Sequence, residues 1–268
     1  GNSGDNQSWD FSSLQESEIE IINFISPAGT IYESIHPSAN LCIETDDELF
    51  YLDKNSSGVV IVGYENLAIN TLLIPLPLTY NLIRQDGPNT IIDDVFPNIG
   101  VIDNSIAPVI SLNPLHNQID SLKIKAVVVS DFHVDAWGDV TIPIGTFAAL
   151  RLKVEEVTTT EFYAYCSTGG LQGGWFPAPS SLIPVETEIE KRYQWWSNDP
   201  MFKFMLAELE VDSLDNVSEA SFLITPPSSS VSDLLVSDFN VYPIPTTSSL
   251  IVDSQNNEFT SLELVDIT

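Results

Sequence analysis

Few residues of this chain have the types and spacing that chemistry requires, and the most suggestive group surrounds His133. In Asp131–Asp135 the order is Asp-Phe-His-Val-Asp, so polar and apolar residues alternate. Alternate residues of a β-strand share a face, so the imidazole and two carboxylates could form a metal or acid–base site there. Neither His36 nor His116 adds an HxH or HExxH spacing. We therefore interpret His133 as a solvent-facing strand residue.

Signatures of other enzyme classes are missing from the sequence. No G-x-S-x-G elbow marks a serine nucleophile, and the glycines of Gly169–Gly174 lack the Lys-Ser/Thr of a P-loop. Carboxylates are so frequent that two of them do not identify a glycoside hydrolase, which needs a defined separation in a cleft. The sequence therefore predicts no catalytic residue.

An aromatic pair in a glycine- and proline-rich segment is the best candidate for ligand binding. The segment Ser167–Pro184 holds Trp175 and Phe176 among four glycines and three prolines. Long loops without secondary structure are often functional, and exposed rings there could stack on sugars or anchor a partner protein. In the alternative interpretation both rings fold back and cap a sheet. We predict Trp175 and Phe176 as ligand-binding residues and keep both interpretations open.

The charge balance restricts the partners. The 268 residues include 38 acidic and 9 basic side chains, for a net charge of −29, while 43% are hydrophobic. Such a chain is globular, and its field repels nucleic acid and anionic lipid headgroups. We predict no cofactor, with a calcium ion as the alternative, and no D-x-D-x-D-G loop identifies calcium ligands. No apolar run approaches the roughly 20 residues of a transmembrane helix, so no transmembrane segment is predicted.

The two cysteines, Cys42 and Cys166, allow two arrangements. In an oxidising compartment they would form one disulfide that closes a long loop and contributes about 2–4 kcal/mol. Otherwise they are two separate buried thiols.

Period-two alternation and turn residues predict an all-β fold, either an antiparallel β-sandwich or a curved, barrel-like sheet. The leucines and valine of Leu150–Glu155 alternate with Arg151, Lys153 and Glu155, which we expect on the solvent face and in cross-strand ion pairs. The segment Pro143–Thr146 lies before this strand, and its proline and glycine predict a turn. The adjacent Trp195 and Trp196 must face opposite sides. The expected strands are Glu18–Phe24, Asn40–Thr45, Leu49–Asp53, Val59–Tyr64, Ile119–Ala136, Leu150–Glu155, Val185–Trp196 and Lys203–Val211, with Leu72–Leu82 as an edge strand or extended loop because of its prolines.

A compositional break follows Ile224. The Pro/Ser-rich run that begins at Thr225 is typical of a linker. We therefore predict a main all-β domain over residues 1–224, a linker over 225–238 and a small β unit over 239–268. The alternative is that the last unit is one more hairpin of the main domain.

The last unit resembles the C-terminal sorting domain of proteins exported by the type IX secretion system of Bacteroidetes. The residues that carry the resemblance are Val241, Tyr242, Pro243, Pro245, the strand Leu250–Val252 and the run Val265-Asp266-Ile267-Thr268. Ile244 replaces the usual asparagine, and the family pattern continues through a glycine and further strands, so we predict a partial sorting domain. Residues Asn6–Leu14 and Val134–Phe147 resemble uncharacterised secreted Bacteroidetes proteins.

The resemblance implies the type IX machinery as a partner and a location outside the cell or on the outer-membrane surface. We predict a non-enzymatic binding module for a carbohydrate or a surface protein. One alternative is an extracellular glycan hydrolase with a carboxylate pair, and another is a structural or adhesion protein of the cell surface.

Overall fold

The computed structural model describes residues 3–45, 48–169, 172–199, 202, 204–224, 239–242 and 251–254. Its contacts divide the chain into two compact units, Gly1–Ile224 and Thr225–Thr268. In the second unit, β14 (Phe239–Tyr242) pairs with β15 (Ile251–Ser254). Val241 and Tyr242 belong to β14, whereas the linker and Pro243, Pro245 and Asp266 of the sorting motif lie outside the described residues. The sorting domain therefore stays a prediction.

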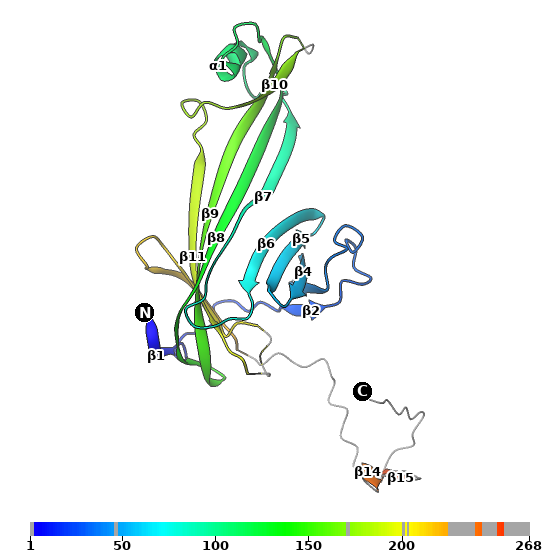
Figure 1. Cartoon of the computed structure of the whole chain (residues 1–268), viewed down its shortest axis with the longest axis vertical. Helices are drawn as coiled ribbons and strands as arrows, with labels where there is room; N and C mark the ends of the chain where they lie inside the picture. The colour runs from blue at the N-terminus through cyan, green and yellow to red at the C-terminus, as the bar shows by residue number, and fades with distance from the viewer. Residues whose placement is uncertain are drawn as a thin grey trace. The chain divides into compact units, whose positions relative to one another are not determined.

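The first unit is all-β, as the sequence predicted, and consists of two sheets (Figure 1). Sheet B is antiparallel, with strands in the order β2-β3-β4-β5-β6. Sheet A has the order β1-β8-β9-β11-β12-β13, with β7 beside β8 and β10 beside β9. The strands of sheet B are β2 (Asn23–Ile25), β3 (Leu41–Glu44), β4 (Leu49–Asn55), β5 (Gly58–Tyr64) and β6 (Leu67–Pro75). Those of sheet A are β1 (Gly4–Asp10), β7 (Ile83–Pro97), β8 (Gln118–Ile142), β9 (Gly145–Ser167), β10 (Gly173–Pro177), β11 (Glu186–Trp196), β12 (Ala207–Val211) and β13 (Val217–Phe222).

A long β-hairpin forms the centre of sheet A. Strands β8 and β9 have 25 and 23 residues, pair along their whole length and are joined by the predicted turn at Pro143. At about 3.3 Å per residue, the hairpin is about 80 Å long. Its far end carries η1 (Asn104–Ile106) and α1 (Ala107–Ser111), as Figure 1 shows.

A β-bulge at Asp135 changes which face of β8 is buried. The register with β9 shifts between Val134 and Ala136, so one extra residue enters β8 at this point. Before the bulge, Phe132 and Val134 join one hydrophobic cluster. After it, Ala136, Val140 and Ile142 join a different cluster. Because one inserted residue moves every following side chain to the opposite face, β8 contributes to a core on each side of sheet A.

The first of these cores joins the two sheets. Leu72 and Ile74 of β6 pack against Phe132 and Val134 of β8 and against Leu152 and Val154 of β9. Val59, Val60 and Trp196 cover the edges of this cluster. Sheet B therefore covers one face of sheet A, which is the sandwich-like part of the fold.

The second core lies on the other face, where sheet A curls into an open half-barrel. Trp9 and Phe11 meet Trp195, Leu206 and Ala207 there. They come from β1, β11, β12 and the segments next to them, which the curl brings together.

The ion pair between Arg151 and Asp135 lies at the bulge. Asp135 accepts two hydrogen bonds from Arg151, from Nε and from Nη2, both at 2.8 Å. Arg151 is buried, although its alternation with leucines predicted a solvent-facing side chain, and that prediction was wrong. The physical reason is the curl, which encloses the face of β9 opposite the leucines.

Other cross-strand ion pairs agree with the prediction. Arg192 of β11 pairs with Glu156 of β9, and Lys123 Nζ of β8 lies 3.6 Å from an oxygen of Asp93 on β7. Lys191 of β11 instead reaches Asp215 in the turn between β12 and β13.

Several predicted strands were wrong in their bounds. Those predicted at Ile119–Ala136 and Leu150–Glu155 are parts of the longer β8 and β9, and two others are shorter than predicted. Of Glu18–Phe24, only the last two residues belong to a strand, β2. Ile19 and Ile21 are exposed, so the alternation of residue types there does not correspond to a paired strand. The strand predicted at Lys203–Val211 begins at Ala207. The Pro-containing run behaves as predicted, because β6 is an edge strand that ends at Pro75.

We expect Asp135→Asn to lower the free energy of unfolding by about 3 kcal/mol, since it leaves a buried guanidinium without its carboxylate. Asp131→Asn is the matched control, because Asp131 is exposed on the same strand and only bonds Gln85 at 2.9 Å. The control should change stability by less than about 0.5 kcal/mol. Urea unfolding followed by tryptophan fluorescence measures both values, and equal effects would contradict the role given to the buried pair.

Candidate functional site

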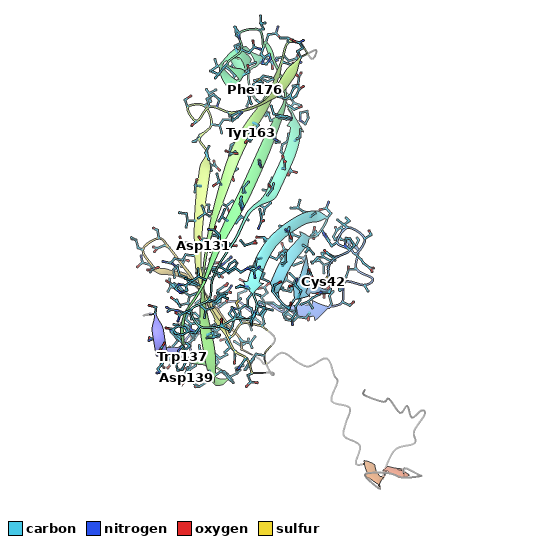
Figure 2. All side chains as sticks on the ribbon, in the orientation of Figure 1. Cys42, Asp131, Trp137, Asp139, Tyr163 and Phe176 are labelled. Carbon is cyan, nitrogen blue, oxygen red and sulfur yellow. The ribbon has the colours of Figure 1, made fainter. Side chains whose placement is uncertain are left out.

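The predicted aromatic pair lies on a strand, so the prediction of a structureless loop was wrong. Strand β10 pairs with the end of β9 and places Trp175 opposite Tyr165. Phe176 packs into the cluster that contains Ala164 and Cys166, next to His116, whose ring centroid is 5.5 Å away. Figure 2 labels Phe176 at this end of the hairpin. Phe176 therefore caps the sheet, as one interpretation held.

Trp175 faces the other way. It is 36% exposed, and its ring meets Tyr165 edge-on with centroids 5.4 Å apart. Lys123 Nζ lies 5.3 Å from a Trp175 ring centroid and 5.0 Å from that of Tyr163. Ligand binding by Trp175 remains a prediction, and the lysine over its ring covers part of the surface that a sugar would need.

The residues around His133 do not converge on a site. Asp135 is engaged by Arg151, and Asp131 accepts a hydrogen bond from Gln85. His36 is buried in the unit, with Nε2 2.6 Å from the carbonyl oxygen of Glu65. Among the described residues, no group of three or more His, Cys, Asp and Glu is placed to hold a metal ion.

Cys42 and Cys166 are both free and buried. Cys42 is on β3 of sheet B, where Figure 2 labels it, and Cys166 is near the end of β9 in sheet A. Burial raises the pKa of each thiol, which keeps both protonated and unreactive at neutral pH. The arrangement with two separate thiols is therefore the one that the structure shows.

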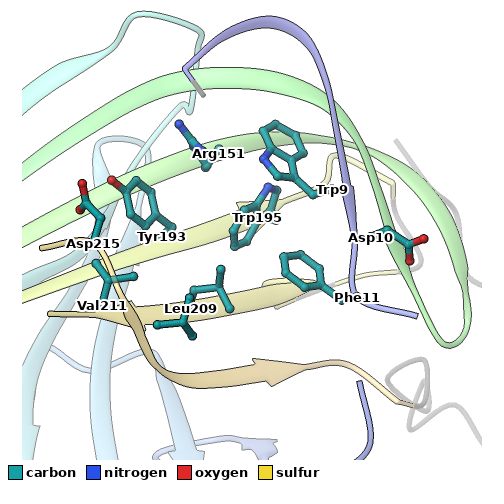
Figure 3. Close-up of a pocket in the computed structure, with 10 residues that line it drawn as sticks. Trp9, Asp10, Phe11, Arg151, Tyr193, Trp195, Leu209, Val211 and Asp215 are labelled. Atoms are coloured by element: carbon teal, nitrogen blue, oxygen red, sulfur yellow. The ribbon is translucent and has the colours of Figure 1, made fainter. Parts of the chain in front are cut away.

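A pocket inside the half-barrel brings side chains from several strands together, and sequence reasoning missed it (Figure 3). Its volume is about 180 Å³. Four aromatic residues line it, together with a buried arginine, three aliphatic residues and two acids. They are Trp9, Phe11, Tyr193, Trp195, Arg151, Leu209, Val211, Val217, Asp10 and Asp215.

Arg151 orders the aromatic wall of this pocket. Its guanidinium carbon lies 5.6 Å from the ring centroid of Trp9 and 4.9 Å from that of Tyr193. A guanidinium over a ring face attracts it electrostatically, and the bidentate bond to Asp135 fixes the guanidinium itself. The rings are therefore held in place in the wall of the pocket.

The indole N–H of Trp195 is a hydrogen-bond donor without a partner among the described residues. Its ring packs edge-on against Phe11, with centroids 4.9 Å apart, and against Trp9 at 5.6 Å. Its Nε1 is buried and has no hydrogen-bond partner within the described part of the chain. Buried donors are normally paired, so this indole N–H is an exception in the core beside the pocket. Trp196 lies on the opposite face against the inter-sheet core, as the adjacent positions predicted.

Two ionised carboxylates belong to residues of this pocket. That of Asp215 lies at its rim, whereas that of Asp10 points away from it, because Trp9 and Phe11 on either side face inward (Figure 3). Hydrogen bonds from Ser12 lower the pKa of Asp10 below its ordinary value. The hydrogen bond from Lys191 lowers the pKa of Asp215 in the same way. Both groups are therefore acceptors at neutral pH, and neither holds a proton that a general acid would donate.

The carboxyl group with a raised pKa lies elsewhere. Burial raises the pKa of Glu208, whose carboxylate accepts a hydrogen bond from Gln194 Nε2 at 2.5 Å. It lies with Glu210, Glu219 and Ser221 around a hollow of about 20 Å³. Such a hollow has room for a single water molecule and not for a sugar.

The chain matches no protein-family model, and it matches neither a curated protein nor a solved structure. In the part of the chain that the structure describes, no helix is long and apolar enough to span a membrane. The assignment of function therefore depends on the pocket and on the sequence.

We expect Glu208→Gln to change how stability depends on pH. The folded-state pKa of Glu208 lies above its ordinary value of 4.5, so the folded protein binds more protons than the unfolded chain above that pH. The wild type therefore loses stability as the pH rises from 4.5 through the folded-state pKa, and the variant lacks this loss. Urea unfolding at a series of pH values measures the difference, and parallel curves for the two proteins would contradict it.

Proposed function

We propose that this chain is an exported binding protein without catalytic activity, whose ligand is a carbohydrate held in the half-barrel pocket. The observation that carries the proposal is the combination of four aromatic side chains, a buried arginine and the ionised carboxylate of Asp215 around one pocket. Ligand sites in proteins typically combine apolar walls with a few placed polar groups.

The chemistry of the pocket fits a sugar ring. The C–H faces of a sugar pack on aromatic rings, while its hydroxyl groups both donate and accept hydrogen bonds. Asp215 would accept a hydrogen bond from one of these hydroxyl groups. The volume of about 180 Å³ is below the roughly 300 Å³ of typical small-molecule pockets, so it suits one ring or a chain terminus.

The carboxylates of the pocket are better suited to binding a sugar than to hydrolysing one. A glycosidase needs one carboxylic acid that keeps its proton near neutral pH. Both acids of the pocket have lowered pKa values, and Glu208, whose pKa is raised, lies at a different and much smaller hollow.

Two features of the sequence support a place outside the cell. Residues 239–268 resemble a type IX sorting domain, and the net charge of −29 suits an extracellular setting. We therefore propose export by the type IX machinery, with the main domain secreted or displayed on the outer-membrane surface.

A glycan array followed by calorimetry tests the proposal. Val217→Trp places a large ring at the exposed edge of the pocket, and Asp215→Asn removes its anionic acceptor. Since a hydrogen bond to a charged group contributes about 1.5–3 kcal/mol, we expect Asp215→Asn to bind at least about tenfold more weakly. The control is Asp94→Asn, an exposed aspartate of β7 that does not line the pocket, and it should bind as the wild type does.

The variant Trp175→Ala distinguishes binding in the half-barrel pocket from binding at the predicted site of Trp175 and Phe176. The pocket account expects normal binding by Trp175→Ala. Loss of binding in that variant, with normal binding by the pocket variants, would move the site to the end of the hairpin. Release of reducing sugar by the intact protein would favour the hydrolase instead.

A further inference from the structure

The segment that closes the far end of the long hairpin is a packed structure. It joins β7 to β8 and contains η1 and α1. The Asn98 side chain donates to the carbonyl oxygens of Ile102 at 2.9 Å and Ile119 at 3.2 Å, and Asn117 N donates to the Ser167 carbonyl at 2.9 Å. Ala107 and Ile110 of α1 are buried against the ends of β8 and β9. We call residues 97–118 the hairpin tip.

Outside this small core, the tip exposes aliphatic side chains. Five of them are well exposed: Ile99 at 84%, Val101 at 72%, Val109 at 56%, Leu112 at 89% and Leu115 at 72%. Helix α1 is thus apolar on both sides, with Ile110 inward and Val109 outward. A helix that is apolar all round is normally covered on all sides.

Leu112 adds a second indication. It is the C-cap of α1, in the left-handed conformation with φ of 54°. Glycine or asparagine is the usual residue in this conformation at the end of a helix. A leucine that is almost fully exposed gives no packing within the chain to offset this backbone preference.

The tip is also nearly uncharged in a strongly acidic protein. Between Pro97 and Gln118 the only Asp, Glu, Lys or Arg is Asp103, while the whole chain has a net charge of −29. The same segment has no Trp, Tyr, Phe, Met, Lys or Arg.

This composition favours a lipid surface over a protein partner. Protein interfaces are enriched in Trp, Tyr, Met and Arg, and leucine and valine are under-represented among their hot spots. Leu, Ile and Val are the side chains that hydrocarbon accepts most readily. We propose that the hairpin tip is a membrane-docking element, whose exposed aliphatic side chains enter the surface of a bilayer with zwitterionic headgroups.

The depth and the lipid follow from the same observations. Irregular backbone has polar groups that hydrocarbon leaves unpaired, so only the side chains enter and the backbone stays at the headgroups. The acidic chain repels anionic lipid, which selects headgroups without net charge. The acidic field that repels anionic lipid headgroups does not repel headgroups without net charge.

Docking at the tip leaves the pocket accessible. Strand β8 runs from Gln118 at the tip to Ala136 beside the pocket wall, which is about 60 Å at 3.3 Å per residue. The inference does not depend on the ligand of the pocket.

Flotation of the full chain with phosphatidylcholine vesicles tests the proposal. We expect the intact protein to float with the vesicles, and less of it to float when phosphatidylserine is mixed in. In Leu112→Ser with Leu115→Ser, we expect the partition coefficient to fall roughly 100-fold, since burial of each leucine contributes about a factor of ten.

The matched control is Ile31→Ser with Leu214→Ser. These two aliphatic residues are 76% and 79% exposed and lie outside the tip. The control should partition as the wild type does, and all four substitutions are at exposed sites, so circular dichroism should show an unchanged fold.

Three results would overturn the proposal. The first is that the intact protein stays out of phosphatidylcholine vesicles. The second is an equal loss of partition in the control. The third is a concentration-dependent dimer, seen by sedimentation equilibrium and abolished by the tip substitutions, which would make a second copy the occupant of the tip.

Discussion

A buried charge at a β-bulge determines much of this structure. Asp135 is the extra residue that moves the apolar side chains of β8 from one face of sheet A to the other, and it holds the guanidinium of Arg151 by two hydrogen bonds. A buried arginine is costly without a partner, so the bulge and the pair depend on each other. With the bulge in place, one sheet supports two cores.

The two cores have different consequences. On one side, sheet B covers β8 and β9 and makes the sandwich-like part of the fold. On the other, sheet A curls on itself, and residues of β1, β9, β11 and β12 meet around the pocket. Arg151 links the fold to the site, because the guanidinium that pairs with Asp135 also contacts the rings of Trp9 and Tyr193. The requirement to pair a buried charge thus also orders the aromatic wall of the pocket.

The sequence predicted the local structure well where alternation was strong. The leucines of Leu150–Glu155 and the turn at Pro143 gave the long hairpin and one of its buried faces. The side chain of Arg151 was wrongly predicted to face solvent, because alternation cannot show that a sheet curls and buries its second face. The pocket was missed for the same reason, since Trp9 and Trp195 are distant in sequence. Glycine and proline around Trp175 predicted a loop, but pairing with β9 outweighed this local preference.

The claim that the half-barrel pocket is the binding site can be tested at single atoms. The chain has five tryptophans, and each gives an indole N–H signal in a ¹H–¹⁵N NMR spectrum, assigned by Trp→Phe substitution. During titration with the carbohydrate that binds most tightly, the account predicts a large shift of the Trp195 indole signal, because the residue lines the pocket and a bound ring changes the environment of its indole. The signals of Trp137 and Trp175 should stay in place. A spectrum in which Trp175 moves and Trp195 does not would contradict the account.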